Sequence, residues 1–111
     1  MRTARVDRTF AALADPYQRE VIDLLSERPR AAGDLARQVG LTPPAMSRRL
    51  RVLREAGLVE ESHPEFDSRV RIYALRPGAM AELKRWLNET ERLWADQLRA
   101  LKYHLAHKDG E

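Results

Sequence analysis

Between residues 33 and 59, hydrophobic and polar positions follow the pattern of two short helices joined by a tight turn, at about 33–38 and 43–56. Gly40 tolerates the left-handed backbone that often ends a helix, and Thr42 and Pro43 suit the cap and the first position of the next one. One face of the second helix is apolar, with Met46, Leu50, Leu53 and Gly57. The opposite face carries Pro44, Ser47, Arg48, Arg51 and Glu55. The pattern therefore predicts a helix that is buried along one side and basic along the other.

The other segments predict three more helices and a β-hairpin. Helices are expected at 3–13, at 16–27 and from the end of the hairpin to about 107, and strands at 58–63 and 69–75 with a polar turn between them. Residues 30–32 form a short connector or a few residues of strand. Asp15 and Pro16 begin the second helix, Gln18 completes a capping-box spacing, and the buried side is expected to contain Tyr17 and Val21. A hairpin directly after a basic helix is a wing, so the predicted fold class is mostly α with a small β-hairpin: a winged helix-turn-helix with a long C-terminal helix.

The last helix carries an apolar stripe along its full length, in steps of three and four residues from Met80 to Leu105. A helix of roughly 28 residues would be about 42 Å long, which exceeds what a small three-helix core can cover. We therefore expect a two-fold homodimer, with a helix folded wholly onto its own domain as the alternative. The expected interface residues are Phe10, Leu83, Leu87, Trp94, Leu98, Leu101 and Leu105.

Length and composition indicate one ordinary globular domain over residues 1–111, made of a core and wing (1–76) and a dimerisation helix (77–111). Hydrophobic residues make up 43% of the chain and charged residues 33%, which is typical of a folded protein. No apolar run approaches the roughly 20 residues of a membrane span, and the N-terminus lacks a signal-peptide core, so we expect no membrane association and a cytoplasmic location. The chain has no cysteine, which excludes disulfides, thiolate metal sites and a cysteine nucleophile.

The positive charge is concentrated in the part that contains the basic helix. Residues 1–76 carry fourteen arginines, no lysine and eleven acids, whereas residues 77–111 carry six bases and six acids. This distribution favours double-stranded DNA as the partner, because phosphate contacts supply much of the affinity of DNA-binding proteins. A solvated arginine face is the alternative. Arg69 and Arg71 would let the wing reach DNA backbone, although Glu65 and Asp67 at its tip would oppose this contact.

The chain resembles the ArsR-type family of winged-helix bacterial repressors in three segments: FAALADPYQREVIDLL, GDLARQVGLTPPAMSRRLRVLREAGLVE and DSRVRIYAL. A two-fold dimer would place its two DNA-contacting helices about one DNA turn apart, so we expect an inverted-repeat operator. The resemblance implies that the protein is a repressor, with Ala45, Ser47, Arg48 and Arg49 nearest the DNA. Helical projection favours Arg48 and Arg51 and places Arg49 nearer the buried flank. The full set of expected DNA-binding residues is Thr42, Pro44, Ala45, Ser47, Arg48, Arg49, Arg51, Arg69 and Arg71.

The metal-binding motifs of that family are missing from this chain. Residues 31–35, Ala-Ala-Gly-Asp-Leu, stand where the family's thiolate pair would be, and Pro77, Gly78 and Ala79 stand near the position of its zinc-binding aspartate. We therefore expect no metal and no cofactor. His104 and His107 lie three apart and could share a helix face, but two histidines near a charged terminus are more often solvated.

Catalysis is not expected. The sequence has no phosphate-binding glycine loop and no nucleophile elbow, and the adjacent Glu60 and Glu61 point to opposite faces of a strand. Two other readings stay open beside a DNA-binding regulator. One is a winged-helix adaptor that binds proteins rather than DNA, and the other is a ligand- or metal-responsive sensor with a site foreign to the family.

Overall fold

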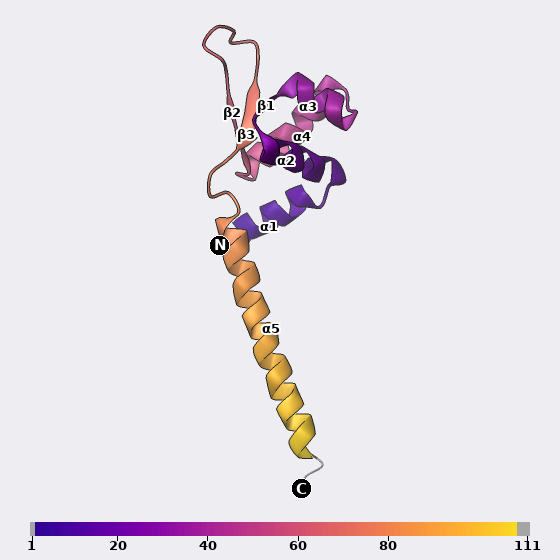
Figure 1. Cartoon of the computed structure of the whole chain (residues 1–111), viewed down its shortest axis with the longest axis vertical. Coiled ribbons are helices and arrows are strands. Elements are labelled where there is room, and N and C mark those ends of the chain that lie inside the picture. The colour runs from indigo at the N-terminus through magenta and orange to yellow at the C-terminus, as the bar shows by residue number, and fades with distance from the viewer. Residues whose placement is uncertain (1, 109–111) are drawn as a thin grey trace. The chain divides into compact units, whose positions relative to one another are not determined.

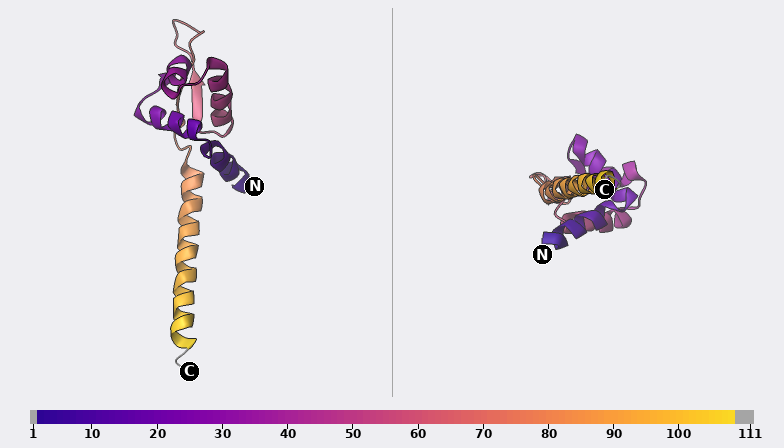
Figure 2. Two further views of the ribbon diagram at one scale, coloured as in Figure 1. Left: turned by 90° about the vertical axis from the view of Figure 1, so that its right-hand side faces the viewer. Right: turned by 90° about the horizontal axis from the view of Figure 1, so that it is seen from below.

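The computed structural model describes residues 2–108, and the side chains of residues 5–107, as five helices and a small sheet (Figure 1). The chain divides into two compact units, Met1–Met80 and Ala81–Glu111. The first contains α1 (Arg2–Leu13), α2 (Pro16–Glu27), β1 (Arg30–Ala31), α3 (Ala32–Val39), α4 (Pro43–Glu55), β2 (Val59–Ser62) and β3 (Ile72–Leu75). The second contains α5 (Ala81–Lys108), a single uninterrupted helix (Figure 2). The predicted fold class is confirmed.

The sheet is antiparallel in the order β1-β3-β2, and the returning strand is shorter than predicted. We expected it to begin at Arg69, but β3 begins at Ile72. The reason is a local turn, in which the Asp67 carboxylate accepts hydrogen bonds from the Arg69 backbone N–H at 3.0 Å and from its Nε at 3.2 Å. Aspartate side chains compete in this way with the ladder of a sheet. Arg69 and Arg71 therefore lie in the loop before the strand.

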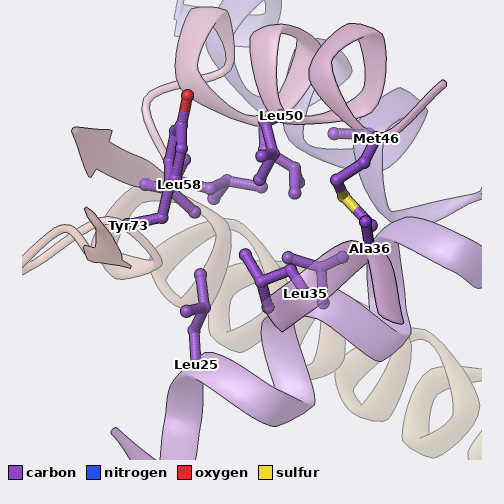
Figure 3. Close-up of a cluster of buried hydrophobic side chains, with 11 residues drawn as sticks. Leu25, Leu35, Ala36, Met46, Leu50, Leu58 and Tyr73 are labelled. Carbon is purple, nitrogen blue, oxygen red and sulfur yellow. The ribbon is translucent and has the colours of Figure 1, made fainter. Parts of the chain in front are cut away.

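The core of the first unit draws on α1 to α4 and on both strands of the hairpin (Figure 3). Its buried residues are Ala12, Val21, Leu25, Leu35, Ala36, Met46, Leu50, Leu53, Leu58, Val59 and Tyr73. The residues that α2 and α4 contribute lie three or four apart, so one face of each of these two amphipathic helices is removed from water. Burial of these apolar side chains supplies most of the driving force for folding.

Two predictions at the start of α2 are wrong. Tyr17 was expected in the core but is 40% exposed, whereas Gln18 is buried at 4% exposure. The Gln18 amide donates to the carbonyl of Ala12, near the end of α1, and does not turn back to close a capping box with Asp15. A buried amide needs a partner, and the carbonyls at a helix end need donors, so this bond satisfies both groups.

The turn between α3 and α4 forms as predicted. Gly40 ends α3 in the left-handed conformation, at φ 81° and ψ 35°, and its N–H donates to the carbonyl of Ala36. Thr42 caps α4, because its hydroxyl accepts a hydrogen bond from the N–H of Ala45 at 3.3 Å, and Pro43 occupies the first helical position. These two features fix the point at which α4 begins, and with it the direction of every later side chain.

Gly40→Ala should destabilise the fold by about 1–2 kcal/mol, because a Cβ disfavours the left-handed backbone even though no other atom lies within 4 Å of it. The matched control is Gly33→Ala, in the first turn of α3, where the new Cβ would meet Arg37 Nη1 at an ordinary 3.6 Å. That variant should be neutral or slightly stabilising. Urea unfolding followed by circular dichroism at a fixed protein concentration measures both, and equal effects would contradict the explanation.

Candidate nucleic-acid interface

Helix α4 presents a basic face on the side opposite its packing surface. Met46, Leu50 and Leu53 are no more than 1% exposed, and Figure 3 shows Met46 and Leu50 pointing into the core. On the other side Pro44, Arg48 and Arg51 are exposed, and Ala45 and Ser47 are half-buried at its edge. Arg48 and Arg51 form no ion pair within the described residues. Their guanidinium groups are therefore available to phosphates or base edges.

Arg49 lies on the flank of α4 and contacts the start of α2. Its Nη1 forms an ion pair with the Asp15 carboxylate, and its guanidinium carbon lies 5.0 Å from the centre of the Tyr17 ring. Asp15 also caps α2, since its other carboxylate oxygen accepts a hydrogen bond from Tyr17 N at 2.8 Å. One carboxylate thus connects the beginning of α2 to the middle of α4. The arginine is only 32% exposed, as expected for a side chain on the buried flank of the helix.

Arg71 connects the wing to α4. Its Nη2 donates to the Ser47 hydroxyl at 3.0 Å, and its Nη1 donates to the Tyr73 hydroxyl at 3.2 Å. The same Nη1 lies 3.7 Å from a carboxylate oxygen of Glu61. The loop before β3 is therefore held against the helix by a side chain that we had expected to contact DNA backbone.

Glu61, on β2, is the acceptor at the centre of this group. It accepts a hydrogen bond from the Tyr73 hydroxyl at 2.5 Å and another from Arg54 Nη1 at 2.8 Å. The Tyr73 hydrogen bond, together with Arg54 and Arg71, lowers the pKa of Glu61 below its ordinary 4.5. Burial, and then the hydrogen bond to Glu61, raises the pKa of Tyr73 to about 12. Ionised Glu61 therefore stabilises the fold above its ordinary pKa, and that contribution is lost as the pH falls through the lowered value.

The tip of the wing combines a paired carboxylate with exposed groups. Asp67 has its pKa lowered by the backbone hydrogen bond from Arg69 and then by the Arg69 side chain. The Arg69 side chain is 91% exposed and Phe66 is 90% exposed. Arg69 thus offsets the negative charge of Asp67, whereas Glu65, two residues earlier, is exposed.

The sequence reasoning missed the roles of Arg54, Glu61 and Tyr73. A signal was present, because Glu61 and Tyr73 become direct cross-strand partners once the two strands are paired in register. Residues opposite each other on neighbouring strands have Cβ atoms close enough to interact. The hydrogen bonds that involve Ser47 and Arg54 come from a different element, α4. The spacing of residues along the sequence gives no comparable signal for them.

Among residues 2–108 no three metal-ligating side chains come together. His107 contacts Tyr103: its Nδ1 lies 2.8 Å from the Tyr103 carbonyl oxygen, and the two rings are stacked.

In the same part of the chain, no helix has both the length and the apolar content that crossing a membrane requires.

Comparison with known proteins identifies the family. A model of the helix-turn-helix domain matches residues 13–62, from the end of α1 through β2. The HTH-type transcriptional regulator Rv2034 of Mycobacterium tuberculosis is 37% identical over 92 residues, which are 83% of this chain and 80% of that protein.

Solved structures agree with this match. An ArsR-like transcriptional regulator from Rhodococcus sp. RHA1 superposes with a TM-score of 0.78 at 26% identity, covering 89% of this chain and 88% of the other. The homodimeric winged helix-turn-helix DNA-binding domain Mb0332 of Mycobacterium bovis, a possible ArsR-family regulator, has a TM-score of 0.64 at 25% identity, covering 82% and 83%. These proteins are named as transcriptional regulators, Mb0332 as a possible one, in agreement with the prediction that this chain is a regulator and not an enzyme. Its sequence and fold place it in the ArsR-type family of winged helix-turn-helix transcriptional regulators.

Proposed function

We propose that two copies of this chain bind an inverted-repeat operator and repress transcription, with α4 in the major groove of each half-site. The observation that carries the proposal is the pair of exposed arginines, Arg48 and Arg51, on the face of α4 that the core leaves uncovered. The second helix of a helix-turn-helix is the element that enters the major groove. Arginine suits that place because its planar fork donates to guanine edges and to phosphates.

The other predicted contacts surround this pair. Thr42, Pro44, Ala45 and Ser47 lie at the N-terminal end of α4, which in this class of motif is the end that contacts base edges. We expect the Arg69 side chain, which is 91% exposed, to contact the DNA backbone from the wing. Arg49 and Arg71 stay in the proposed interface, although both also form contacts within the fold.

The proposal includes a homodimer joined along α5. In a single chain Leu87, Trp94, Leu98, Leu101 and Leu105 are 48–66% exposed, and they follow one another at helical spacing. An apolar stripe this long is unfavourable in water, and a second copy covers it by two-fold symmetry. Phe10 is also exposed, at 43%, whereas Leu83 is buried within the single chain at 8% and does not need a partner for its burial. The homodimeric state of Mb0332 supports this arrangement.

A two-fold dimer separates its two recognition helices by about one turn of DNA, roughly 34 Å, which is why an inverted repeat is the expected target. Repression follows where the operator overlaps a promoter, because bound protein then excludes polymerase. We propose that the core and wing, residues 1–76, and the dimerisation helix, residues 77–111, form one DNA-binding domain per protomer. An adaptor for other proteins would present apolar groups on the outer face of α4, and in this helix only Val52 among the large hydrophobic residues is exposed.

Arg48→Ala should weaken operator binding by about 1–3 kcal/mol and relax the sequence preference at one position if this arginine reads a base. The operator is first obtained by selection from random DNA, and affinities for operator and random duplex are then measured by fluorescence anisotropy at several salt concentrations. Arg28→Ala, at the end of α2, removes the same charge outside α4 and the wing and should change both affinities little. Equal affinity of the wild type for both duplexes would rule out a sequence-specific regulator.

Leu98→Glu should convert the dimer to monomers, because it places a charge in the middle of the exposed stripe of α5. Ala100→Glu adds the same charge on α5 outside the stripe and should leave the dimer intact. Sedimentation equilibrium measures both. A wild-type chain that sediments as a monomer, or a Leu98→Glu variant that remains dimeric, would contradict the proposed interface.

A further inference from the structure

The hydroxyl of Ser47, on α4, is arranged unlike those of Thr9 on α1 and Ser26 on α2. Thr9 and Ser26 donate to the carbonyls four residues earlier, at 3.1 Å and 2.9 Å, which is the usual bond of such residues inside a helix. Ser47 forms no such bond within the described residues and instead accepts a hydrogen bond from Arg71 Nη2 at 3.0 Å. A guanidinium group has only donors, so Ser47 is the acceptor in this contact and its own proton remains unused.

Arg71 is held in place from its other side. Its Nη1 donates to the Tyr73 hydroxyl, and Tyr73 in turn donates to Glu61, so the donors all run in one direction and end on a carboxylate. Tyr73 is 2% exposed, and Arg54 fixes the second oxygen of Glu61. If Arg71 turned away from Ser47, it would also give up its hydrogen bond to Tyr73 and its 3.7 Å approach to Glu61, so these contacts favour the observed position.

We propose that Glu61 and Tyr73 are positioning residues which, through Arg71, make Ser47 a hydrogen-bond donor toward DNA. The matching group on DNA is an acceptor on a base edge, such as guanine N7 or O6 or thymine O4. A cytosine or adenine amino group is itself a donor, so it meets only the second lone pair of the hydroxyl and leaves the Ser47 proton without an acceptor. This inference rests on the proposed function, because Ser47 must lie beside DNA for its proton to be used.

The same contacts change the role of the wing arginine. The charge of Arg71 is already offset by Glu61, 3.7 Å away, so this residue contributes less to phosphate binding than an unpaired arginine would. The main effect of Arg71 is on how strongly the protein prefers its operator over random DNA. The wing thus affects α4 by orienting the Ser47 side chain of that helix.

The test compares Glu61→Gln with Glu60→Gln. Both remove one negative charge from β2, but Glu60 is exposed and forms no hydrogen bond or ion pair through its side chain within the described residues. Affinities for the selected operator and for random duplex are measured for each variant. Glu60→Gln should keep the wild-type ratio of the two affinities, whereas Glu61→Gln should lower it about five- to tenfold, the effect of one hydrogen bond.

Variants at Ser47 complete the cycle. Ser47→Ala should lose the same discrimination, Ser47→Thr should retain it because the hydroxyl is kept, and Glu61→Gln should add no further loss to Ser47→Ala. Operators with single 7-deazaguanine or methylphosphonate substitutions distinguish a base acceptor from a phosphate. Thermal melting checks that each variant is folded, and Tyr73→Phe replaces Glu61→Gln in the cycle if that variant is not.

This inference is overturned if Glu61→Gln and Glu60→Gln have the same ratio of operator affinity to random-duplex affinity, or if the losses are additive in the double variant. The proposed function still stands in that case, provided that the wild type prefers its operator. A wild-type chain that binds both duplexes equally would instead overturn the proposed function, and this inference with it.

Discussion

Burial of one side of α4 is the constraint on which the interface depends. Met46, Leu50 and Leu53 are almost completely removed from water. At about 100° per residue, fixing these three positions fixes the direction of every other side chain on the helix. Arg48 and Arg51 point outward because they have no other direction available. The packing of the core therefore determines which arginines are exposed to a binding partner. A rotation of the helix by one residue would bury a charged side chain.

The arginines of this protein belong to two groups that composition does not distinguish. The Arg30 side chain is only 4% exposed and bonds to Glu27, Asp34 and the carbonyl of Leu24, which satisfies a buried charge between α2 and α3. Arg49, Arg54 and Arg71 are likewise paired with carboxylates. Arg48 and Arg51 are not paired within the described residues. In the proposed interface, the electrostatic attraction to DNA therefore comes from fewer side chains than the fourteen arginines of residues 1–76 suggest.

Local signals made the helices and the turn predictable. Periodicity, Asp15-Pro16, Gly40 and Thr42-Pro43 each act within a few residues, and the observed boundaries lie close to the expected ones. Features that depend on contacts distant in sequence were not predictable in the same way. The Arg49–Asp15 pair joins residues 34 apart, and the Arg71–Ser47 bond joins residues 24 apart. The error at Tyr17 has a nearer origin, because Gln18 lies in the interior by donating to the carbonyl of Ala12, six residues earlier on α1.

The arrangement around Ser47 separates two tasks that both fall to polar groups at a DNA interface. Exposed, unpaired arginines attract phosphate and contribute affinity that depends strongly on salt. A hydroxyl carries no charge, so it adds little attraction at a distance, but its direction can be fixed by its neighbours. Fixing a donor in advance reduces the entropy lost on binding and makes a wrong group on the DNA costly, since two opposed donors leave both unsatisfied. The buried Tyr73 and the ionised Glu61 supply that rigidity from within the wing.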